Sequence, residues 1–404
     1  MVDNKRRIIR FDFVKDYACD GKICGSRCCR DVWGIDIDAV TLKKYQNLTN
    51  KKLREKLQNS IRYNSSLKKY ILQRGNNGAC PFLSNDGLCG IQRRFGEDYI
   101  SDICCTYPRS YLDFGDYITE TVGLSCYLAS KNFLKLNTSL ELVDIYEDIK
   151  RINIIKSKKA NTIAYNNWIE INNTVMQILQ NNKITIRERL IIAFMLGEAI
   201  QDLEVNGGDL HSLLMTFLSF GTQDELLQLF LQVPVMRNNY INDFLELFIS
   251  ICNDRITKQD SEIGQYKTMV TNYYKIDEKN TIKEYCEKYM QAKDGYDSYM
   301  KDNYPLFEEN YLVHEWFSLA MPILAKGSII DNMIIFLLYF RLQQMILMVL
   351  IAEKQDKLKE DDIVNCVSYV TKLVEHCPSI FYIFTRYLAD KKYSLINYLK
   401  IWLA

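Results

Sequence analysis

The sequence predicts a mainly α-helical protein, with an irregular cysteine-rich α+β region at the N-terminus packed on a helical C-terminal domain. Nine of the 13 cysteines lie in the first 126 of 404 residues. Beyond about residue 130, apolar residues recur with the helical period and turn signals become sparse. At roughly 150 residues per domain, we expect a cysteine-rich metal-binding domain over residues 1–130 and a helical domain over residues 131–404.

In the first region, residues 33–38 alternate apolar and polar side chains and predict a short strand. Residues 53–72 read as weakly helical, and residues 111–121 predict a small hairpin centred on Gly115 and Asp116. A region of this kind cannot build a large core. Bound metal is therefore expected to supply much of its stability, a contribution of about 10–16 kcal/mol for structural zinc in small peptides.

The helical region carries start and stop signals in order. Thr185 and Glu188 form a capping box for a helix that runs to Gly207, and Thr222 with Glu225 forms a second. Residues 281–293 also predict a helix. Apolar residues at spacings of four, three and four predict a last amphipathic face, which Cys377-Pro378 ends; they are Ile363, Val367, Val370 and Val374.

The most apolar stretch, residues 328–355, predicts a buried core helix. Polar residues interrupt it, including Asp331 and Arg341, so each apolar run is far shorter than the roughly 20 residues that span a bilayer. We therefore expect no transmembrane segment, while peripheral association with a membrane stays open. The chain also begins with charged residues and no apolar signal segment, which predicts a cytoplasmic protein with reduced thiols.

Composition narrows the class of partner. Lys and Arg total 51 and Asp and Glu total 50, a formal net charge of +1, with 48% hydrophobic residues. This is a globular composition, and it lacks the excess of clustered cations that binding to nucleic acid requires. We predict no nucleic-acid partner.

The cysteines form two blocks, Cys19-x4-Cys24-x3-Cys28-Cys29 and Cys80-x8-Cys89-x14-Cys104-Cys105, with Cys126 a further 21 residues on. The first histidine is His211, so a metal here would be held by thiolates alone. Such ligands suit a closed zinc site or an iron–sulfur cluster, and the spacing does not separate the two. Adjacent cysteines diverge, so one of Cys28 and Cys29 could bind a metal while the other faces a second metal, the core or a substrate.

Eight cysteines would serve two four-thiolate sites, although the count alone does not show two, and Cys104 reads as the spare thiol. The radical S-adenosylmethionine spacing C-x3-C-x2-C is excluded because Asp31 occupies its third position. The bacterial ferredoxin spacing is absent as well. Four isolated cysteines are expected to be small buried hydrophobic residues; they are Cys252, Cys286, Cys366 and Cys377.

These strings resemble the flagellin lysine-N-methylase family of the FliB type, whose cysteine-rich part belongs to a wider group of zinc- or iron-chelating proteins. The resemblance rests on CDGKICGSRCCRDVWGIDID at 19–38, CPFLSNDGLCGIQRRFGEDYISDICCTYPR at 80–109, GLSCYL around Cys126, and ENYLVHEWFSLAMPI at 309–323, with VEHCP at 374–378 weaker. It implies a cytosolic enzyme that methylates flagellin lysines with S-adenosylmethionine and a [4Fe–4S] cluster. The positions that coincide with family cysteines are Cys19, Cys24, Cys28, Cys29, Cys80, Cys89, Cys105 and Cys126.

Around these cysteines several residues have two readings. Arg109 could bind the carboxylate of S-adenosylmethionine or brace the loop as a salt bridge. Asp36 and Asp38 could attract a substrate ammonium or form a solvated face, and Trp33 could shield a cluster or pack in the core. A lysine amine must lose its proton before methylation, and none of the candidate bases stands out; they are Tyr99, Tyr107, Tyr111, Tyr117 and His314.

The sequence has no glycine-rich turn of the Rossmann type for S-adenosylmethionine. If that cofactor binds, the open coordination position of a cluster is the expected place. Two other functions stay open: a zinc-stabilised adaptor without enzymatic activity, and an iron–sulfur redox sensor without methyl transfer.

Overall fold

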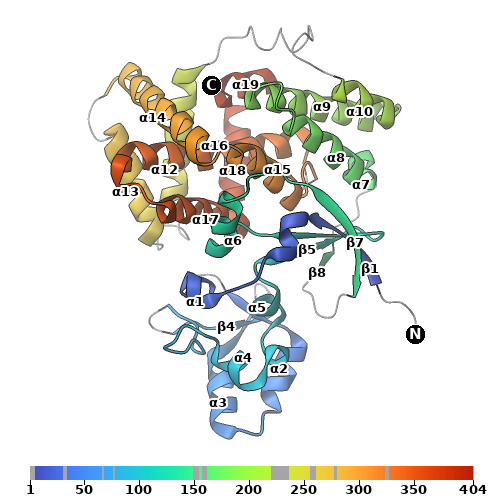
Figure 1. Cartoon of the computed structure of the whole chain (residues 1–404), viewed down its shortest axis with the longest axis vertical. Helices are drawn as coiled ribbons and strands as arrows, with labels where there is room; N and C mark the ends of the chain where they lie inside the picture. Colours follow the sequence, from blue (N-terminus) through green and yellow to red (C-terminus); the bar gives the residue numbers. More distant parts are fainter. Residues whose placement is uncertain are drawn as a thin grey trace. The chain divides into compact units, whose positions relative to one another are not determined.

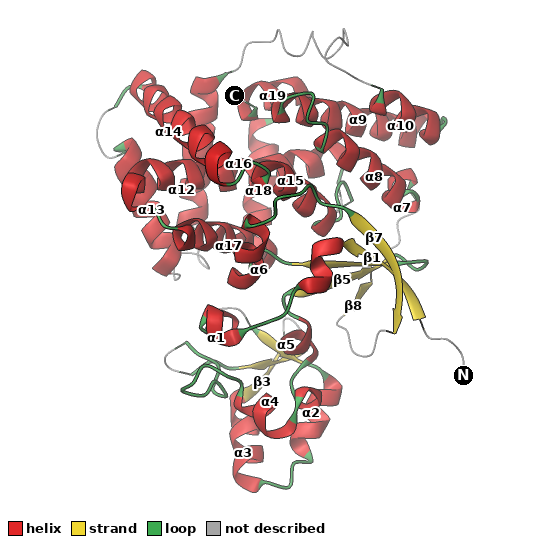
Figure 2. Cartoon of the chain, viewed as in Figure 1, coloured by secondary structure: helices red, strands yellow, loops and turns green. Residues whose placement is uncertain are grey.

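A computed structural model of the chain describes residues 5–30, 34–65, 68–75, 78–148, 154–156, 162–219, 236–254, 261–276, 280–323 and 327–403. The chain divides into two compact units. The first contains Met1–Phe133 and Glu141–Lys158, and the second contains Leu134–Leu140 and Lys159–Ala404. The first unit mixes strands with short helices, whereas the second is helical throughout its described part (Figures 1 and 2).

A five-stranded mixed sheet forms one part of the first unit, in the order β7-β1-β6-β5-β8. Its strands are β1 (Lys5–Phe11), β5 (Arg109–Asp113), β6 (Ile118–Val122), β7 (Leu142–Asp148) and β8 (Ile154–Lys156). β1 runs parallel to β6 and antiparallel to β7. β6 is buried along its whole length, as expected for the central strand of a sheet.

The other part of the first unit carries most of the cysteines. An antiparallel three-stranded sheet, in the order β2-β4-β3, consists of β2 (Ile35–Ile37), β3 (Ile61–Asn64) and β4 (Lys69–Leu72). The short helices of this unit are α1 (Gly21–Cys24), α2 (Ala39–Gln46), α3 (Lys51–Ser60), α4 (Gly90–Phe95), α5 (Asp102–Thr106) and α6 (Tyr127–Leu134). A small core that includes Ile37, Leu57 and Phe82 also holds Cys80, and Cys29, Cys89 and Cys105 pack against it.

Helices of the second unit surround one long buried helix, α16 (Ile329–Lys354). The others are α7 (Ile163–Asn166), α8 (Trp168–Leu179), α9 (Ile186–Asn206), α10 (Leu210–Leu218), α12 (Arg237–Asn253), α13 (Ser261–Tyr274), α14 (Ile282–Asn303), α15 (Phe307–Ser318), α17 (Glu360–His376), α18 (Pro378–Lys391) and α19 (Leu395–Trp402). α9, α13, α14, α17, α18 and α19 all contact α16. Burial on every side explains why α16 is apolar all round rather than along one stripe.

One helix of the described chain, Ile329–Lys357 with its short 3-10 extension, is long and apolar enough to cross a membrane by length and composition. Its most apolar window is entirely buried inside the protein. This agrees with the core helix that the interrupted apolar pattern predicts.

Most of the predicted elements are confirmed. β5 and β6 form the hairpin around Gly115, Thr185 and Glu188 form a complete capping box, and α14 and α17 lie where the patterns place them. The helix predicted over residues 53–72 is wrong beyond Ser60, because β3 and β4 pair with each other there and bury Ile61 and Leu72. The Thr222–Glu225 capping box and Trp33 lie outside the described residues.

Candidate metal centre and its surroundings

The first cysteine block forms a tight loop around α1. Asp20 caps this helix by accepting hydrogen bonds from the backbone N–H groups of Lys22 and Ile23, and Gly25 ends it in the left-handed region at φ 64°, a conformation that favours glycine. The loop turns back so that the Ser26 N–H donates to the Gly21 carbonyl at 2.8 Å. Cys28 and Cys29 follow in the 3-10 turn Arg27–Cys29.

The second block is tied to the first through the backbone. The Cys80 N–H donates to the Cys29 carbonyl at 2.7 Å. Cys89 pairs with Leu83 in an isolated antiparallel bridge, and the Leu83 N–H donates to the Cys80 carbonyl at 3.0 Å. Residues 80–89 therefore form a closed turn with a cysteine at each end, and Cys29 lies beside it.

Arg74 contacts the backbone where the two cysteine blocks meet. Its guanidinium donates to the carbonyl of Cys29 at 2.6 Å and to the carbonyl of Cys28 at 3.3 Å. A hydrogen bond between the two adjacent thiols raises the pKa of Cys28, and the same bond, with the Arg74 charge, lowers the pKa of Cys29 to about 7. Cys29 is thus the more readily ionised of the two thiols, and the thiolate is the form that binds metal.

The remaining thiols fall into two neighbourhoods. Burial first, and then the charges of Cys126 and Cys24, raise the pKa of Cys19 to about 11. Burial, with smaller contributions from the charges of Cys29 and Cys89, raises the pKa of Cys80 to about 11. The negative charges of neighbouring thiolates repel one another, and a thiophilic cation bound between them would offset that repulsion.

The adjacent residues Cys104 and Cys105 have different surroundings. By surface area Cys104 is exposed, yet the protein around its sulfur raises its pKa to about 12, and the charges of Cys29, Cys80 and Cys89 act in the same direction. The Cys105 Sγ lies 3.3 Å from a carboxylate oxygen of Glu97. The sequence reads Cys105 as a ligand and Cys104 as spare, and this assignment stays a prediction.

All nine N-terminal cysteines are described, and none of the chain's cysteines forms a disulfide. In kind, these thiols fit zinc or an iron–sulfur centre. Within the described ranges, however, no group of three or more His, Cys, Asp or Glu side chains is placed to hold a metal ion. The described sulfurs therefore form no coordination shell here, and the thiol-held metal stays a prediction.

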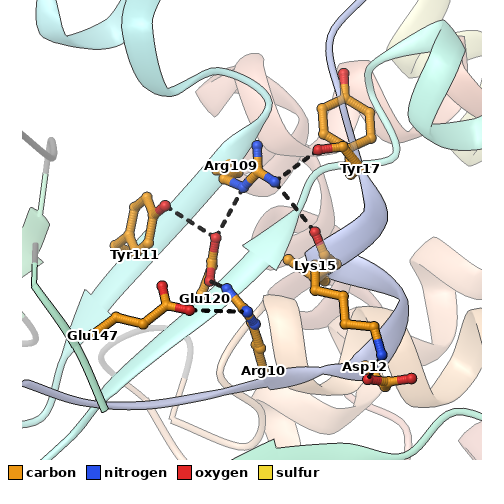
Figure 3. A network of polar contacts seen from close by, with 9 residues as sticks. Arg10, Asp12, Lys15, Tyr17, Arg109, Tyr111, Glu120 and Glu147 are labelled. Atoms are coloured by element: carbon orange, nitrogen blue, oxygen red, sulfur yellow. Dashed lines mark hydrogen bonds and ion pairs between the residues drawn. The ribbon is translucent and has the colours of Figure 1, made fainter. Parts of the chain in front are cut away.

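Arg109, the predicted cofactor ligand, is part of a polar network on the five-stranded sheet (Figure 3). Its Nε donates to Glu120 at 2.9 Å, and its Nη2 donates to the carbonyls of Tyr17 at 2.8 Å and Val14 at 3.2 Å. Glu120 is buried and also accepts from Arg10 at 2.8 Å and Tyr111 at 3.0 Å. Through these contacts Arg109 braces the backbone that leads into the first cysteines. Its binding of S-adenosylmethionine stays a prediction.

Asp36 and Asp38 have local partners. Asp38 accepts hydrogen bonds from the backbone N–H groups of Thr41 at 2.8 Å and Asp102 at 3.0 Å. It thereby caps α2 and holds the start of α5, which carries Cys104 and Cys105. Asp36 forms an ion pair with Lys69 across β2 and β4. These contacts account for both carboxylates without a substrate ammonium.

The predicted bases are scattered over the first unit. Tyr99 lies against Phe95 and Lys44, the Tyr107 hydroxyl is 3.3 Å from the Ser125 Oγ, and Tyr117 stacks on Phe114. With Tyr111 committed to Glu120, the structure assigns none of them as a base. Sequence reasoning missed Tyr17, whose hydroxyl is 3.4 Å from the Cys126 Sγ; its position only 2 residues before Cys19 was the available signal.

His314 lies in the second unit, inside α15, and is fully buried. Its Nδ1 is 2.9 Å from a carboxylate oxygen of Glu315, and the other oxygen of Glu315 has no hydrogen-bond partner among the described residues. Nearby on the same helix, Tyr311 donates to the Tyr339 hydroxyl at 2.7 Å. The structure shows a buried polar pair here and assigns it no catalytic role.

Comparison with known proteins shows which sequences this chain is similar to. Residues 172–402 match the family model described as the FliB lysine N-methylase C-terminal domain. Over 117 residues, 28% of this chain, the sequence is 30% identical to the flagellar biosynthetic protein FliU of Salmonella muenchen, and the match covers 69% of FliU. It is also 30% identical over 117 residues to the lysine-N-methylases of Salmonella choleraesuis and Salmonella typhimurium, covering 29% of each. No solved structure matches the chain.

Proposed function

The chain belongs to the FliB lysine N-methylase family, and from this premise we propose that it transfers methyl groups to the ε-amines of lysines in a protein substrate. The observation that carries the proposal is the family match over residues 172–402, more than half of the chain. The similarity to proteins named lysine-N-methylase supports the same reaction.

Flagellin is the proposed substrate. The support is the name of a relative, a flagellar biosynthetic protein, together with the sequence resemblance described above. The described residues supply no surface that by itself selects flagellin, so the substrate has to be identified by experiment.

S-adenosylmethionine is the proposed methyl donor, and it would supply a methyl group on a positively charged sulfur. A cysteine-held [4Fe–4S] cluster would supply an iron with an open position for the amino and carboxylate groups of that donor. The candidate ligands are the N-terminal thiols, none of which forms a disulfide. Zinc is the alternative ion for the same ligands.

In this reaction the chain itself must receive a neutral lysine and hold the cysteine loops in place. The accepting lysine has to arrive neutral, because only the free amine carries the lone pair that attacks the methyl group. As the new N–C bond forms, the S–CH3 bond of the donor would break and S-adenosylhomocysteine would leave, and the methylated nitrogen would then give its extra proton to water. Holding the cysteine loops in place falls to Arg74, which bonds the Cys28 and Cys29 carbonyls, and to Asp38, which anchors α5.

The test is methyl transfer by the full chain to purified flagellin under anaerobic conditions. We expect mass increases of about 14 Da per methyl group on flagellin lysines, which require both the protein and S-adenosylmethionine. A preparation stripped of metal is the matched control. Flagellin of unchanged mass in the complete reaction would refute the proposal.

Colour and metal content separate the other two functions. A brown protein with absorbance near about 400 nm that leaves flagellin unchanged would be an iron–sulfur sensor, and a colourless zinc protein without transfer would be an adaptor. Binding of S-adenosylmethionine that is the same with and without the metal would refute the cluster as its binding place.

A further inference from the structure

Buried carboxylates in this chain are matched by basic side chains, with one exception. Four carboxylates are buried among the described residues, namely Glu120, Asp243, Glu309 and Glu315. The first three form ion pairs with, in turn, Arg10 and Arg109, Lys391, and Arg189. A buried carboxylate is costly unless a partner offsets its charge. Within the described ranges, Glu315 forms no ion pair with a lysine or arginine, and its ionisable neighbour is His314.

The Glu315 carboxylate has one oxygen paired and one unpaired. Its Oε1 lies 2.9 Å from the Nδ1 of His314. Its Oε2 is also buried and has no hydrogen-bond partner among the described residues. Both residues are fully buried, and a buried acceptor left without a donor destabilises a fold. The unpaired oxygen therefore indicates a place for a hydrogen-bond donor that comes from outside the chain.

A polar stripe connects this carboxylate with the end of α15. Tyr311, Glu315 and Ser318 are spaced by four and three residues, so their side chains share one face of the helix. The Ser318 Oγ lies 3.5 Å from both ring nitrogens of His314. Ser318 is partly exposed and is the last residue of α15, whereas the other members of the stripe are buried. The stripe therefore reaches the surface at Ser318, one helical turn from Glu315.

Tyrosine side chains lie next to the Glu315 carboxylate. Tyr311 donates to the Tyr339 hydroxyl at 2.7 Å, and the centroids of the two rings are 6.1 Å apart. Burial first, and then the charge of Glu315, raises the pKa of both tyrosines. Tyrosine rings attract cations through their faces. A carboxylate in these surroundings suits a cation that carries N–H donors.

We propose that Glu315 binds a primary ammonium group that reaches it along this stripe, and that the acceptor lysine of the substrate protein supplies the group. An ammonium offers three N–H donors and one positive charge, which match the unpaired oxygen and the charge of Glu315. A lysine side chain extends roughly 6 Å beyond its Cα, and Ser318 and Glu315 are about 4.5 Å apart along the helix axis. The choice of lysine rests on the proposed function, whereas the ammonium site does not.

The test uses the full chain and n-butylammonium, which is a lysine side chain without its backbone. Ligand-observed NMR measures its affinity at constant ionic strength, and n-butanol is the neutral compound of the same length. We expect n-butylammonium to bind about tenfold more tightly than n-butanol, or better. Glu315→Gln keeps the size of the side chain and removes its charge, so it should weaken n-butylammonium binding about tenfold or more. Glu353→Gln, at an exposed position of α16, should leave the affinity unchanged.

Three outcomes overturn the proposal. They are equal binding by the wild type and Glu315→Gln, equal binding of n-butylammonium and n-butanol, and displacement of n-butylammonium by an equal concentration of sodium or potassium ions, which would assign the site to a metal cation. Circular dichroism shows whether each variant is folded. If Glu315→Gln does not fold, Ser318→Leu replaces it, because a larger side chain closes the exposed end of the stripe and should give the same loss of binding.

The methylation assay separates this inference from the proposed function. Glu315→Gln should raise the KM for flagellin and leave the KM for S-adenosylmethionine unchanged. A protein that binds n-butylammonium through Glu315 but never methylates flagellin leaves the ammonium site standing and refutes the proposed function. Methyl transfer by Glu315→Gln with an unchanged KM for flagellin does the reverse.

Discussion

At the scale of single residues, Glu120 shows how one buried carboxylate organises a site. It is only 3% exposed and receives hydrogen bonds from Arg10, Arg109 and Tyr111. A buried charge of this kind is tolerated only when it is paired and hydrogen-bonded. Through Arg109, the same carboxylate is connected to the backbone of Val14 and Tyr17, the segment that leads into the first cysteines.

The first prediction tests this connection with Arg109→Gln. We expect the free energy of unfolding to fall by about 1–3 kcal/mol, because the change leaves a buried carboxylate and two carbonyls short of donors. Arg7→Gln is the matched control, since Arg7 pairs with Asp144 at the surface and such pairs contribute about 0–1 kcal/mol. Denaturant titration measures both. Equal losses would contradict the bracing role, and an Arg109 variant of normal stability with weakened S-adenosylmethionine binding would favour the cofactor role.

A second residue-scale prediction concerns pH. His211 Nδ1 lies 2.9 Å from Glu170, and this hydrogen bond raises the pKa of His211 above 6.5. Because the folded-state pKa is raised, the pair stabilises the fold while His211 is protonated, and that stabilisation is lost as pH rises through the folded-state value. Glu170→Gln should lower the pKa of His211. NMR titration of the imidazole protons measures it, with the His376 resonances as reference, and an unchanged titration would contradict the pairing.

At the scale of elements, the helices show where local signals suffice. Thr185 and Thr281 begin α9 and α14 with complete capping boxes, which are readable because both partners lie within four residues of sequence. The helical pattern of residues 53–72 is a wrong prediction where β3 and β4 form. Their pairing buries Ile61 and Leu72 against a core assembled from distant segments, and a weak helical pattern does not survive that competition.

Our third prediction tests the packing of α9 on α16. An added Cβ at Gly197 would overlap the Sδ of Met333, which is itself buried. Gly197→Ala should therefore cost about 1–3 kcal/mol in overpacking, more than the gain in helix propensity of up to about 1 kcal/mol. Gly295→Ala on α14 is the control, because nothing lies within 4 Å of the new Cβ, and it should stabilise by about 0.5–1 kcal/mol.

Gly197→Ala should cost less in a Met333→Ala background than in the wild-type chain, since the overlapping atoms are gone. Thermal or denaturant unfolding of Gly197→Ala, Met333→Ala, their double change and Gly295→Ala gives all four values. A stabilising Gly197→Ala, equal to the effect at Gly295, would show that Met333 moves aside freely.

At the scale of the whole molecule, the two units differ in what holds them together. The second has a large apolar core around α16, which is buried from Asn332 to Ile351. The cysteine-bearing part of the first has a core of 11 buried residues, one of them Cys80, and three more cysteines pack against it. Small cores of this kind usually depend on metals or disulfides, and no disulfide is present.

The fourth prediction follows from this difference. Chelation of metal from the full chain should remove hydrogen-exchange protection from residues 19–30 and 80–105 and leave α16 protected. The reason is that metal binding energy stabilises only the part that supplies the ligands. Exchange measured by mass spectrometry on the intact chain, before and after chelation and after metal is returned, checks it. Loss of protection in α16 as well, or no loss anywhere, would contradict it.

The sequence alone was sufficient for the helical class of the larger unit, its buried apolar helix, the Gly115 hairpin and the likeness to the lysine N-methylase family. Each rests on residues close together in the chain or on strings of unusual composition. Only the tertiary structure decided how Cys29 meets Cys80, that Tyr17 touches Cys126, and that Arg109 is engaged by Glu120. Those contacts join positions up to about a hundred residues apart in the sequence. The spacing of residues along the chain does not tell which of such distant positions come into contact when the chain folds.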